Sequence, residues 1–223
     1  MIFRELIQNV LILIVFSYLY SLLYRSRFKT RPLYYKTISG LLFGMIAILG
    51  MMFPFFLTAG VMFDGRAIIL CIAGLFGGAL SAVIAAVSTG IFRYLAGGTG
   101  TWTGIAAICL SAFTGIVFHY FLKSGKFSLS MLNIYLFGLL VNVEMILLLF
   151  TLPEPINIIA LNKMSIPLIT IYPLVTVVIS KMLLDQEKKA ETEKQLRKYQ
   201  QKLEDIVAEL SVHNTEHEKF QKE

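Results

Sequence analysis

Residues 64–98 read DGRAIILCIAGLFGGALSAVIAAVSTGIFRYLAGG, and the path of this stretch determines how the rest of the chain crosses the membrane. Its apolar part, residues 67–92, would rise about 39 Å as one straight helix, whereas the hydrocarbon core of a bilayer is about 30 Å thick. An arginine stands near each end of the stretch, and glycines interrupt its middle. The stretch therefore either crosses the membrane as one strongly tilted helix or turns back on itself at Gly77 and Gly78.

The composition of the chain is that of a membrane protein. Hydrophobic residues make up 57% of the sequence and charged residues 15%, a balance outside the range of ordinary soluble domains. The two cysteines, Cys71 and Cys109, lie in apolar runs without the spacing of metal ligands. We therefore expect membrane lipid around the chain, and no metal site, cofactor or nucleic-acid partner.

Hydropathy predicts an all-α polytopic membrane protein with six or seven membrane helices, one pair of which forms the broken hairpin. The expected helices span residues 6–24, 37–57, 67–77, 79–96, 104–122, 133–152 and 166–184. Residues 1–184 contain twelve basic and four acidic residues, whereas residues 185–223 contain eight basic and ten acidic ones. We therefore expect a membrane domain over 1–184 and a charged helical tail over 185–223.

Basic loops predict the orientation of the chain. Residues 25–36 carry five Lys or Arg side chains and residues 123–130 carry two, so both loops should be cytoplasmic. If residues 67–96 crossed the membrane once, the first basic loop and the tail would lie on opposite sides. A hairpin that enters and leaves on the outer side removes this contradiction, with the N-terminus outside and the C-terminus cytoplasmic. One tilted helix with an inverted first loop is the alternative.

The hairpin predicts a site for an anion. Folding back at the glycines brings Arg66 and Arg93 to the same level, and two convergent guanidinium groups suit a small carboxylate, which each can bind with two hydrogen bonds. Gly97 and Gly98 follow directly, in a loop that can present backbone N–H groups to the same anion. The alternatives are that both arginines anchor helix ends in the interface and that the glycines form a flexible connection.

Two acidic residues complete the candidate site. Glu144 is the only acidic residue deep in a predicted span, and intramembrane carboxylates usually face the bundle interior and find a partner. We expect it in the polar pocket or supporting it, with an interhelical structural bond as the alternative. Asp64 precedes the first arm of the hairpin, where we expect it to cap the helix rather than to bind ligand.

The tail carries a heptad pattern. Its a and d positions are Leu196, Tyr199, Leu203, Ile206, Leu210, His213, His217 and Phe220. Apolar spacing that alternates between three and four is typical of a short parallel coiled coil, so we expect a homodimer through residues 196–220. A solvated amphipathic helix on a monomer is the alternative.

The chain resembles the LytS/YhcK-type five-transmembrane sensor domain, 5TMR-LYT, of bacterial histidine kinases and diguanylate cyclases. The resemblance covers about residues 1–184 and rests on the D-x-R, GLFGG, IFRYLAGG and VNVEM sequences. It implies a signal receptor in the bacterial plasma membrane that detects a small ligand. Some members of the family respond to pyruvate or similar small carboxylates, which would place Arg66 and Arg93 in the ligand site. Members commonly carry Asn-x-Arg where this chain has Asp64.

The expected function is therefore the sensor region of a two-component kinase or a cyclase. No phosphoacceptor block, nucleotide-binding glycine box, GGDEF sequence or other catalytic motif occurs in the chain, which we expect to be the sensor half of a larger protein. A small-molecule transporter or a vitamin-type substrate-binding subunit is the alternative, because broken helices around a midplane site are common in transporters. The heptads of the tail favour the receptor.

Overall fold

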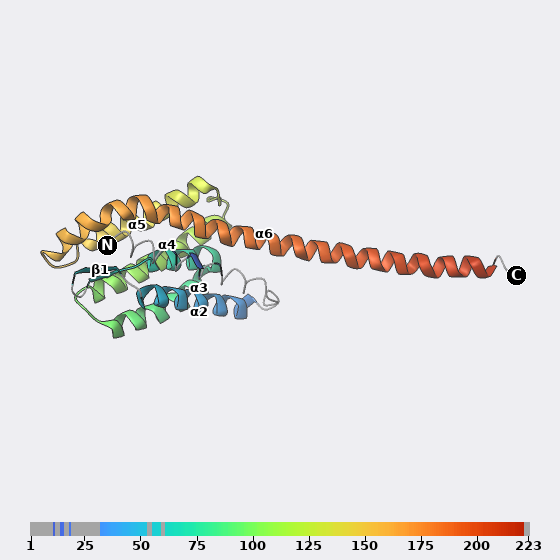
Figure 1. Ribbon diagram of the computed structural model, residues 1–223, viewed down its shortest axis with the longest axis horizontal. Helices are drawn as coiled ribbons and strands as arrows, with labels where there is room; N and C mark the ends of the chain where they lie inside the picture. Colours follow the sequence, from blue (N-terminus) through green and yellow to red (C-terminus); the bar gives the residue numbers. More distant parts are fainter. Residues whose placement is uncertain are drawn as a thin grey trace. The chain divides into compact units, whose positions relative to one another are not determined.

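The computed structural model describes residues 32–52, 55–58 and 61–220, together with positions 11, 14, 15 and 18. Its elements, in order, are α2 (Pro32–Met52), β1 (Phe55–Thr58), β2 (Val61–Phe63), α3 (Arg66–Ala96), α4 (Thr101–Lys123), α5 (Met131–Leu149) and α6 (Ile156–Phe220). Within the described residues, all five helices are long and apolar enough to cross a membrane (Figure 1), which confirms the predicted all-α membrane class. Of the predicted helix over 6–24, only positions 11, 14, 15 and 18 are described, and each of these is helical; the rest lies outside the described residues.

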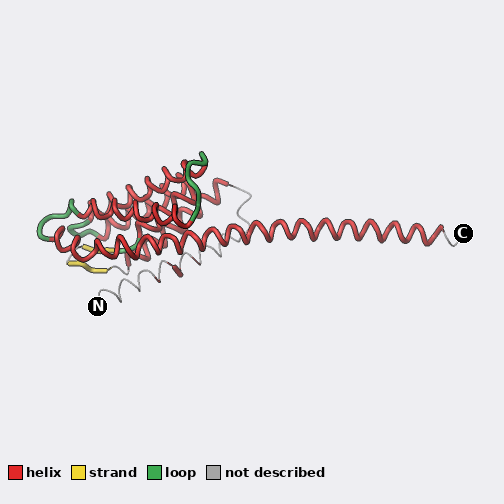
Figure 2. Tube along the Cα trace, turned by 90° about the horizontal axis from the view of Figure 1, so that it is seen from above, coloured by secondary structure: helices red, strands yellow, loops and turns green. Residues whose placement is uncertain are grey.

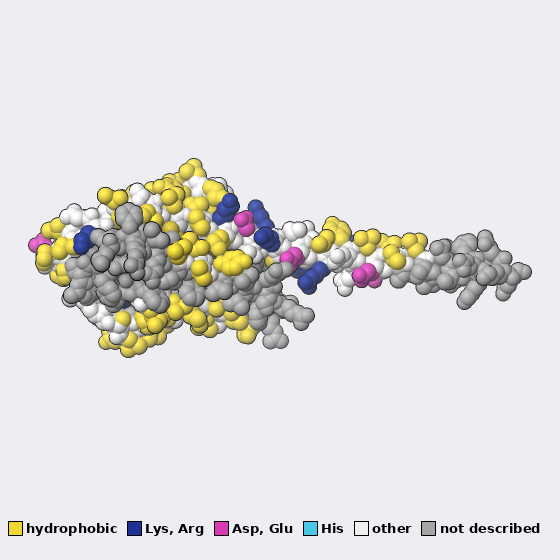
Figure 3. Space-filling model, in the orientation of Figure 1, with side chains coloured by type: hydrophobic (Ala, Val, Ile, Leu, Met, Phe, Trp, Pro, Cys, Tyr) yellow, Lys and Arg dark blue, Asp and Glu magenta, His cyan; other side chains and the backbone are white. Residues whose placement is uncertain are grey.

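The chain divides into two compact units, Met1–Leu183 and Leu184–Glu223. In the first unit the helices lie side by side as a bundle (Figure 2). Hydrophobic side chains cover much of the visible face of this unit (Figure 3), and Val87, Ile91 and Leu95 are each more than half exposed. An apolar surface of this kind is stable against lipid and not against water.

Helix α3 is broken at Gly78, which has φ 74° and ψ −172°. Arg66 and Arg93 would stand about 40 Å apart on a straight helix. Instead, a Cβ built on Gly104 would lie 3.0 Å from Nη2 of Arg66 and 2.6 Å from Nε of Arg93, so both side chains reach the same point. The chain therefore reverses at Gly78, and α3 consists of two arms that run side by side in opposite directions.

The two arms of α3 are buried to different degrees. Nearly every residue of the first arm is buried, with Ile68 through Ala73 at 0% exposure. In the second arm only one stripe is buried, formed by Ser81, Ala82, Ala85, Thr89 and Arg93. The first arm is therefore the central element of the bundle, and the second arm covers it.

Close backbone contact holds the first arm against α4. A Cβ on Gly74 would lie 2.7 Å from the carbonyl carbon of Gly115, so the two helices meet at glycine on both sides. Small residues at such a crossing allow the backbones to pack directly, which is a common means of helix association in membranes.

The predicted helix over 37–57 is wrong at both ends. Helix α2 begins at Pro32, because proline fits the first position of a helix, where no N–H partner is needed. It ends at Met52, since Pro54 cannot continue a helix and disfavours helical geometry in the residue before it. The next residues form strands β1 and β2, paired antiparallel with Phe55 opposite Phe63, and the hairpin leads directly into Asp64.

The last helix begins ten residues before the predicted start at residue 166. Polar residues such as Asn157 and Lys163 lower the hydropathy of its first turns without breaking the helix. Pro167 and Pro173 both lie inside α6. Prolines are tolerated in membrane helices because neighbouring helices and side chains satisfy the backbone groups that they free.

A histidine supports the reversal of α3. The carbonyl of Leu75 lies 2.8 Å from Nδ1 of His119, which must carry the proton because a carbonyl oxygen only accepts. The other ring nitrogen of His119 faces Gly78, since a Cβ on this glycine would lie 2.9 Å from Nε2. The break at Gly78 frees carbonyls in the last turn of the first arm, and α4 supplies a donor for one of them.

We expect His119→Ala to lower the free energy of unfolding by about 1–3 kcal/mol, because a buried carbonyl then loses its donor. His119→Asn is the matched control, since its amide nitrogen stands close to the position of Nδ1 and can donate in its place. Thermal unfolding of both variants in the same detergent measures the difference. Equal destabilisation by both substitutions would contradict a role for this hydrogen bond.

Candidate ligand-binding site

The first unit contains a cavity of about 60 Å³ beside the two ends of α3. Its polar lining residues are Asp64, Arg66, Arg93, Thr103 and Asn142, with Gly100 and Gly104. Its apolar lining residues are Ala67, Ala107, Met145, Leu148, Leu149, Leu152 and Leu168, with Tyr172. One water needs about 10–15 Å³ of such space, so the cavity has room for several atoms of a small molecule.

Asp64 and Arg66 form a buried ion pair at the start of the first arm. Nη1 of Arg66 lies 3.1 Å from Oδ2 of Asp64, and the backbone N–H of Arg66 donates to Oδ1 at 3.0 Å. The carboxylate therefore satisfies an orphan N–H of the first turn, as expected of a cap, although Gly65 occupies the N-cap position itself. The same carboxylate neutralises one of the two arginines.

Arg93 has no such carboxylate. It lies in the last turn of α3, is 2% exposed, and donates from Nη1 to the carbonyl of Gly97 at 3.0 Å. Within the described part of the chain, its Nε is buried without a hydrogen-bond partner. A buried guanidinium with an unused donor is costly unless an acceptor binds it, so Arg93 is the part of the lining most in need of an anion.

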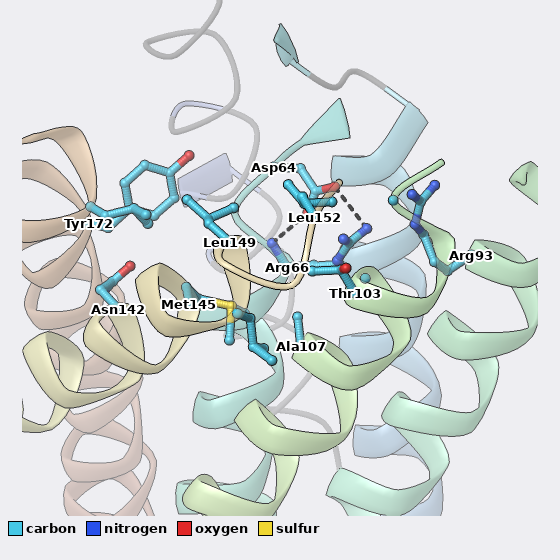
Figure 4. Close-up of a pocket in the computed structure, with 15 residues that line it drawn as sticks. Asp64, Arg66, Arg93, Thr103, Ala107, Asn142, Met145, Leu149, Leu152 and Tyr172 are labelled. Carbon is cyan, nitrogen blue, oxygen red and sulfur yellow. Dashed lines mark hydrogen bonds and ion pairs between the residues drawn. The ribbon is translucent and has the colours of Figure 1, made fainter. Parts of the chain in front are cut away.

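Gly104 allows the two arginines to converge. Because it carries no side chain, Nε of Arg93 and Nη2 of Arg66 both approach the first turn of α4 at this residue. In Figure 4, Arg66 lies beside Thr103, and Arg93 lies farther to the right, on the second arm of α3. The lining side chains thus hold two positive charges and one negative charge, a net charge of one positive.

The structure places Gly97 and Gly98 beside the cavity and not in its lining. The N–H of Gly97 donates to the carbonyl of Tyr94, and the carbonyl of Gly98 accepts from the backbone N–H and the hydroxyl of Thr101. The contribution of this loop to the cavity is therefore indirect, because the carbonyl of Gly97 orients Arg93.

Glu144 does not line the cavity. Both of its carboxylate oxygens lie within 3.0 Å of the hydroxyl of Thr114 on α4. Asn142 takes the place expected for Glu144, because residues two apart on a helix point about 200° apart. The face of α5 that carries Asn142 also carries Met145 and Leu149, at spacings of three and seven, and this is the face that lines the cavity.

Sequence reasoning missed two residues of the lining, Asn142 and Tyr172. Asn142 stands in the middle of an apolar span, which is a recognisable signal, whereas a tyrosine in a membrane helix is common and singles out no site. The hydroxyl of Thr103 lies 3.0 Å from that of Thr151, which ties the start of α4 to the segment after α5.

Comparison with known proteins identifies one family. A family model described as 5TMR of 5TMR-LYT matches residues 17–186, a range that includes every residue of the cavity lining. No curated protein and no solved structure matches the chain.

Proposed function

Because the chain belongs to the 5TMR-LYT family over residues 17–186, we propose that it is the sensor region of a histidine kinase or a diguanylate cyclase and detects a small anionic ligand of the carboxylate type. The family indicates a membrane sensor region of histidine kinases or similar proteins. The nature of the ligand and the route of the signal are the parts that we propose here from the geometry of the cavity.

The proposal rests on the burial of Arg93 and on its unused hydrogen-bond donor. Its guanidinium lines the cavity at 2% exposure, with Nε lacking a partner among the described residues. A carboxylate offers two acceptor oxygens in one plane, which matches the donor geometry of a guanidinium group. It also neutralises the single positive charge that Asp64 leaves in the lining.

The remaining lining supports a small organic ligand. Most of the wall is apolar, from Met145, Leu149 and Leu152 on one side to Leu168 on α6. Binding sites for small organic molecules usually combine such walls with a few convergent polar groups that fix the orientation of the ligand. An inorganic anion would leave this apolar wall without a partner.

We propose that the cavity faces the outer side of the membrane. Thr103 lines it near the start of α4, whereas Lys123 ends the same helix, about 30 Å away, with Lys126 close behind. Basic residues of short loops favour the cytoplasmic side. This orientation has the C-terminal tail in the cytoplasm and the N-terminus outside, in a bacterial plasma membrane.

Helix α6 is the proposed route of the signal. Leu168 and Tyr172 line the cavity at 1% and 3% exposure, and α6 runs as one helix from Ile156 to Phe220. A ligand that displaces these two side chains acts directly on the helix that forms the tail. Shifts of a helix by 1–2 Å are a common means by which receptors transmit binding.

The tail is the proposed dimer contact. The a and d positions of the heptads form the seam of the proposed coiled coil. Five of these residues are more than half exposed on the single chain, namely Leu196, Tyr199, Leu203, Ile206 and Leu210. Their heptad spacing fits the knobs-into-holes packing of a second parallel copy of the same helix, which would remove them from water. The partner that we propose for this seam is therefore a second copy of the chain.

We expect Leu203→Cys to form an intermolecular disulfide at least about ten times faster than Gln201→Cys, because only the seam position brings two Cβ atoms within about 4.5 Å of each other. Both variants carry Cys109→Ala, since Cys109 is exposed and Cys71 is buried. Non-reducing electrophoresis of membranes after mild oxidation measures the rates. Equal rates at the two positions would contradict the proposed coiled coil.

Ligand binding by the purified full chain tests the proposed function. We expect monocarboxylates to raise its unfolding temperature and their uncharged amides to leave it unchanged, because only the acids neutralise Arg93. A ligand at 100 times its Kd stabilises the folded state by about 2.7 kcal/mol. If no carboxylate from two to eight carbons changes the unfolding temperature, the proposed function is wrong.

A further inference from the structure

A second unpartnered polar group lies at the end of the cavity away from the arginines. Asn142 is 1% exposed, and its Nδ2 donates to the carbonyl of Gly138 at 2.6 Å. This contact fixes the orientation of the amide, because the reverse orientation would bring two acceptor oxygens together. Oδ1 is therefore the remaining group, and among the described residues it is buried without a hydrogen-bond partner.

The two groups without a partner among the described residues, Nε of Arg93 and Oδ1 of Asn142, belong to side chains at opposite ends of one cavity. Figure 4 shows Asn142 and Tyr172 on one side of the pocket and Asp64, Arg66 and Arg93 on the other.

Contacts between helices indicate the length of this cavity. Thr103, next to the glycine that both arginines approach, contacts Thr151 just after the end of α5. From Leu149, the last residue of α5, back to Asn142 is seven residues, or about 10 Å of helix.

The wall between these ends is apolar. Met145 and Leu149 from α5 and Ala107 from α4 line the cavity between Asn142 and the arginines (Figure 4), and Leu168 from α6 is also part of the lining. None of these four side chains offers a conventional hydrogen bond to a ligand, so a polar group in the middle of a ligand would lose its water without compensation.

From this arrangement we infer that the ligand is an elongated monoanion, with an acidic group on Arg93, an apolar middle and a hydrogen-bond donor that binds Oδ1 of Asn142. This inference rests on the proposed function and extends it to the far end of the same cavity. The single net positive charge of the lining sets the charge of the ligand. The free acceptor on Asn142 sets the polarity of its other end, and the seven residues of α5 from Leu149 back to Asn142, about 10 Å of helix, set its length.

Three acids test the inference on the full chain: acetate, hexanoate and 6-hydroxyhexanoate. We expect hexanoate to bind at least about ten times more tightly than acetate, because its chain buries apolar surface against Met145 and Leu168. We expect 6-hydroxyhexanoate to bind about 2 to 12 times more tightly than hexanoate, which is the range for one net hydrogen bond. Titration calorimetry in detergent measures all three affinities.

The preference for the hydroxyl group should depend on Asn142. In Asn142→Leu, which keeps the branching of the side chain but has no polar atom, we expect hexanoate and 6-hydroxyhexanoate to bind equally. Asn157→Leu, which removes an amide outside the lining, should retain the preference.

Each result of these titrations decides one point. Equal binding of the two longer acids by the unsubstituted chain, or a preference that persists in Asn142→Leu, overturns the inference and leaves the proposed function standing. Acetate binding as tightly as hexanoate also overturns it. Failure of all three acids to bind overturns the inference, and the proposed function falls with it when no carboxylate from two to eight carbons changes the unfolding temperature.

Discussion

Arg93→Gln is expected to weaken binding of a monocarboxylate by at least about 30-fold. The guanidinium of Arg93 is 2% exposed and lacks an ion-pair partner among the described residues, so an anion in the cavity depends on it for charge and for donors. Loss of one member of a buried, hydrogen-bonded charge pair costs about 2–5 kcal/mol. Titration calorimetry of the purified chain measures the change in affinity.

Arg197→Gln is the matched control for this substitution. It removes the same charge from an exposed position on the tail, within the second unit, and should leave the affinity unchanged. The folded state of Arg93→Gln should remain intact, because the substitution removes a buried charge whose Nε has no partner. Binding of the acid to Arg93→Gln at the affinity of the unsubstituted chain would remove Arg93 from the site.

The second large effect is expected at the reversal of α3. Gly78→Ala should prevent the chain from reaching its fold, or lower the free energy of unfolding by more than about 3 kcal/mol. The pair of angles φ 74° and ψ −172° lies in a region that is essentially restricted to glycine. In addition, the new Cβ would lie 2.9 Å from Nε2 of His119. The backbone strain and the contact with His119 both destabilise the Gly78→Ala variant, so their costs add.

Gly90→Ala is the matched control for Gly78→Ala. Gly90 lies in the second arm of the same helix, and a Cβ there meets nothing within 4 Å. Alanine is favoured over glycine inside a helix by about 0.5–1 kcal/mol, so this variant should be as stable as the unsubstituted chain or slightly more stable. The yield of monodisperse protein and the unfolding temperature in detergent report both variants. Similar behaviour of the two would mean that Gly78 is not required for the reversal.

The reversal of α3 was predictable because it depends on residue types that can be recognised in the sequence. A charge at each end of an apolar run sets where the run meets the interface, and adjacent glycines mark where the backbone can leave the helix. The structure breaks the helix at Gly78 and brings Arg66 and Arg93 to the same glycine of α4.

Burial within the hairpin was not predictable from the sequence. Both arms are mainly apolar, yet the first arm is enclosed and the second exposes Val83, Val87 and Ile91. This difference arises from the positions of α2 and α4, which both pack against α3. Hydropathy along the chain contains no information about these neighbours.

Which of Asn142 and Glu144 reaches the cavity was likewise not predictable from the sequence of α5. Charge makes Glu144 the more conspicuous residue, whereas the rotation of α5 decides which side chain reaches the cavity. That rotation depends on packing across helices, for example at Gly138, where a Cβ would lie 2.9 Å from the Cβ of Thr176. The predicted orientation in the membrane and the predicted dimer through residues 196–220 stay predictions.

Ligand binding in the cavity is expected to change the contact between the tails of two copies. The disulfide rate of Leu203→Cys measures this effect. A monocarboxylate that binds the cavity should change this rate at least about threefold, with a midpoint at its Kd, and the change should be absent when Arg93→Gln is added. A rate that stays constant while calorimetry shows the cavity filled would contradict the account, because the ligand would then bind without acting on the tail.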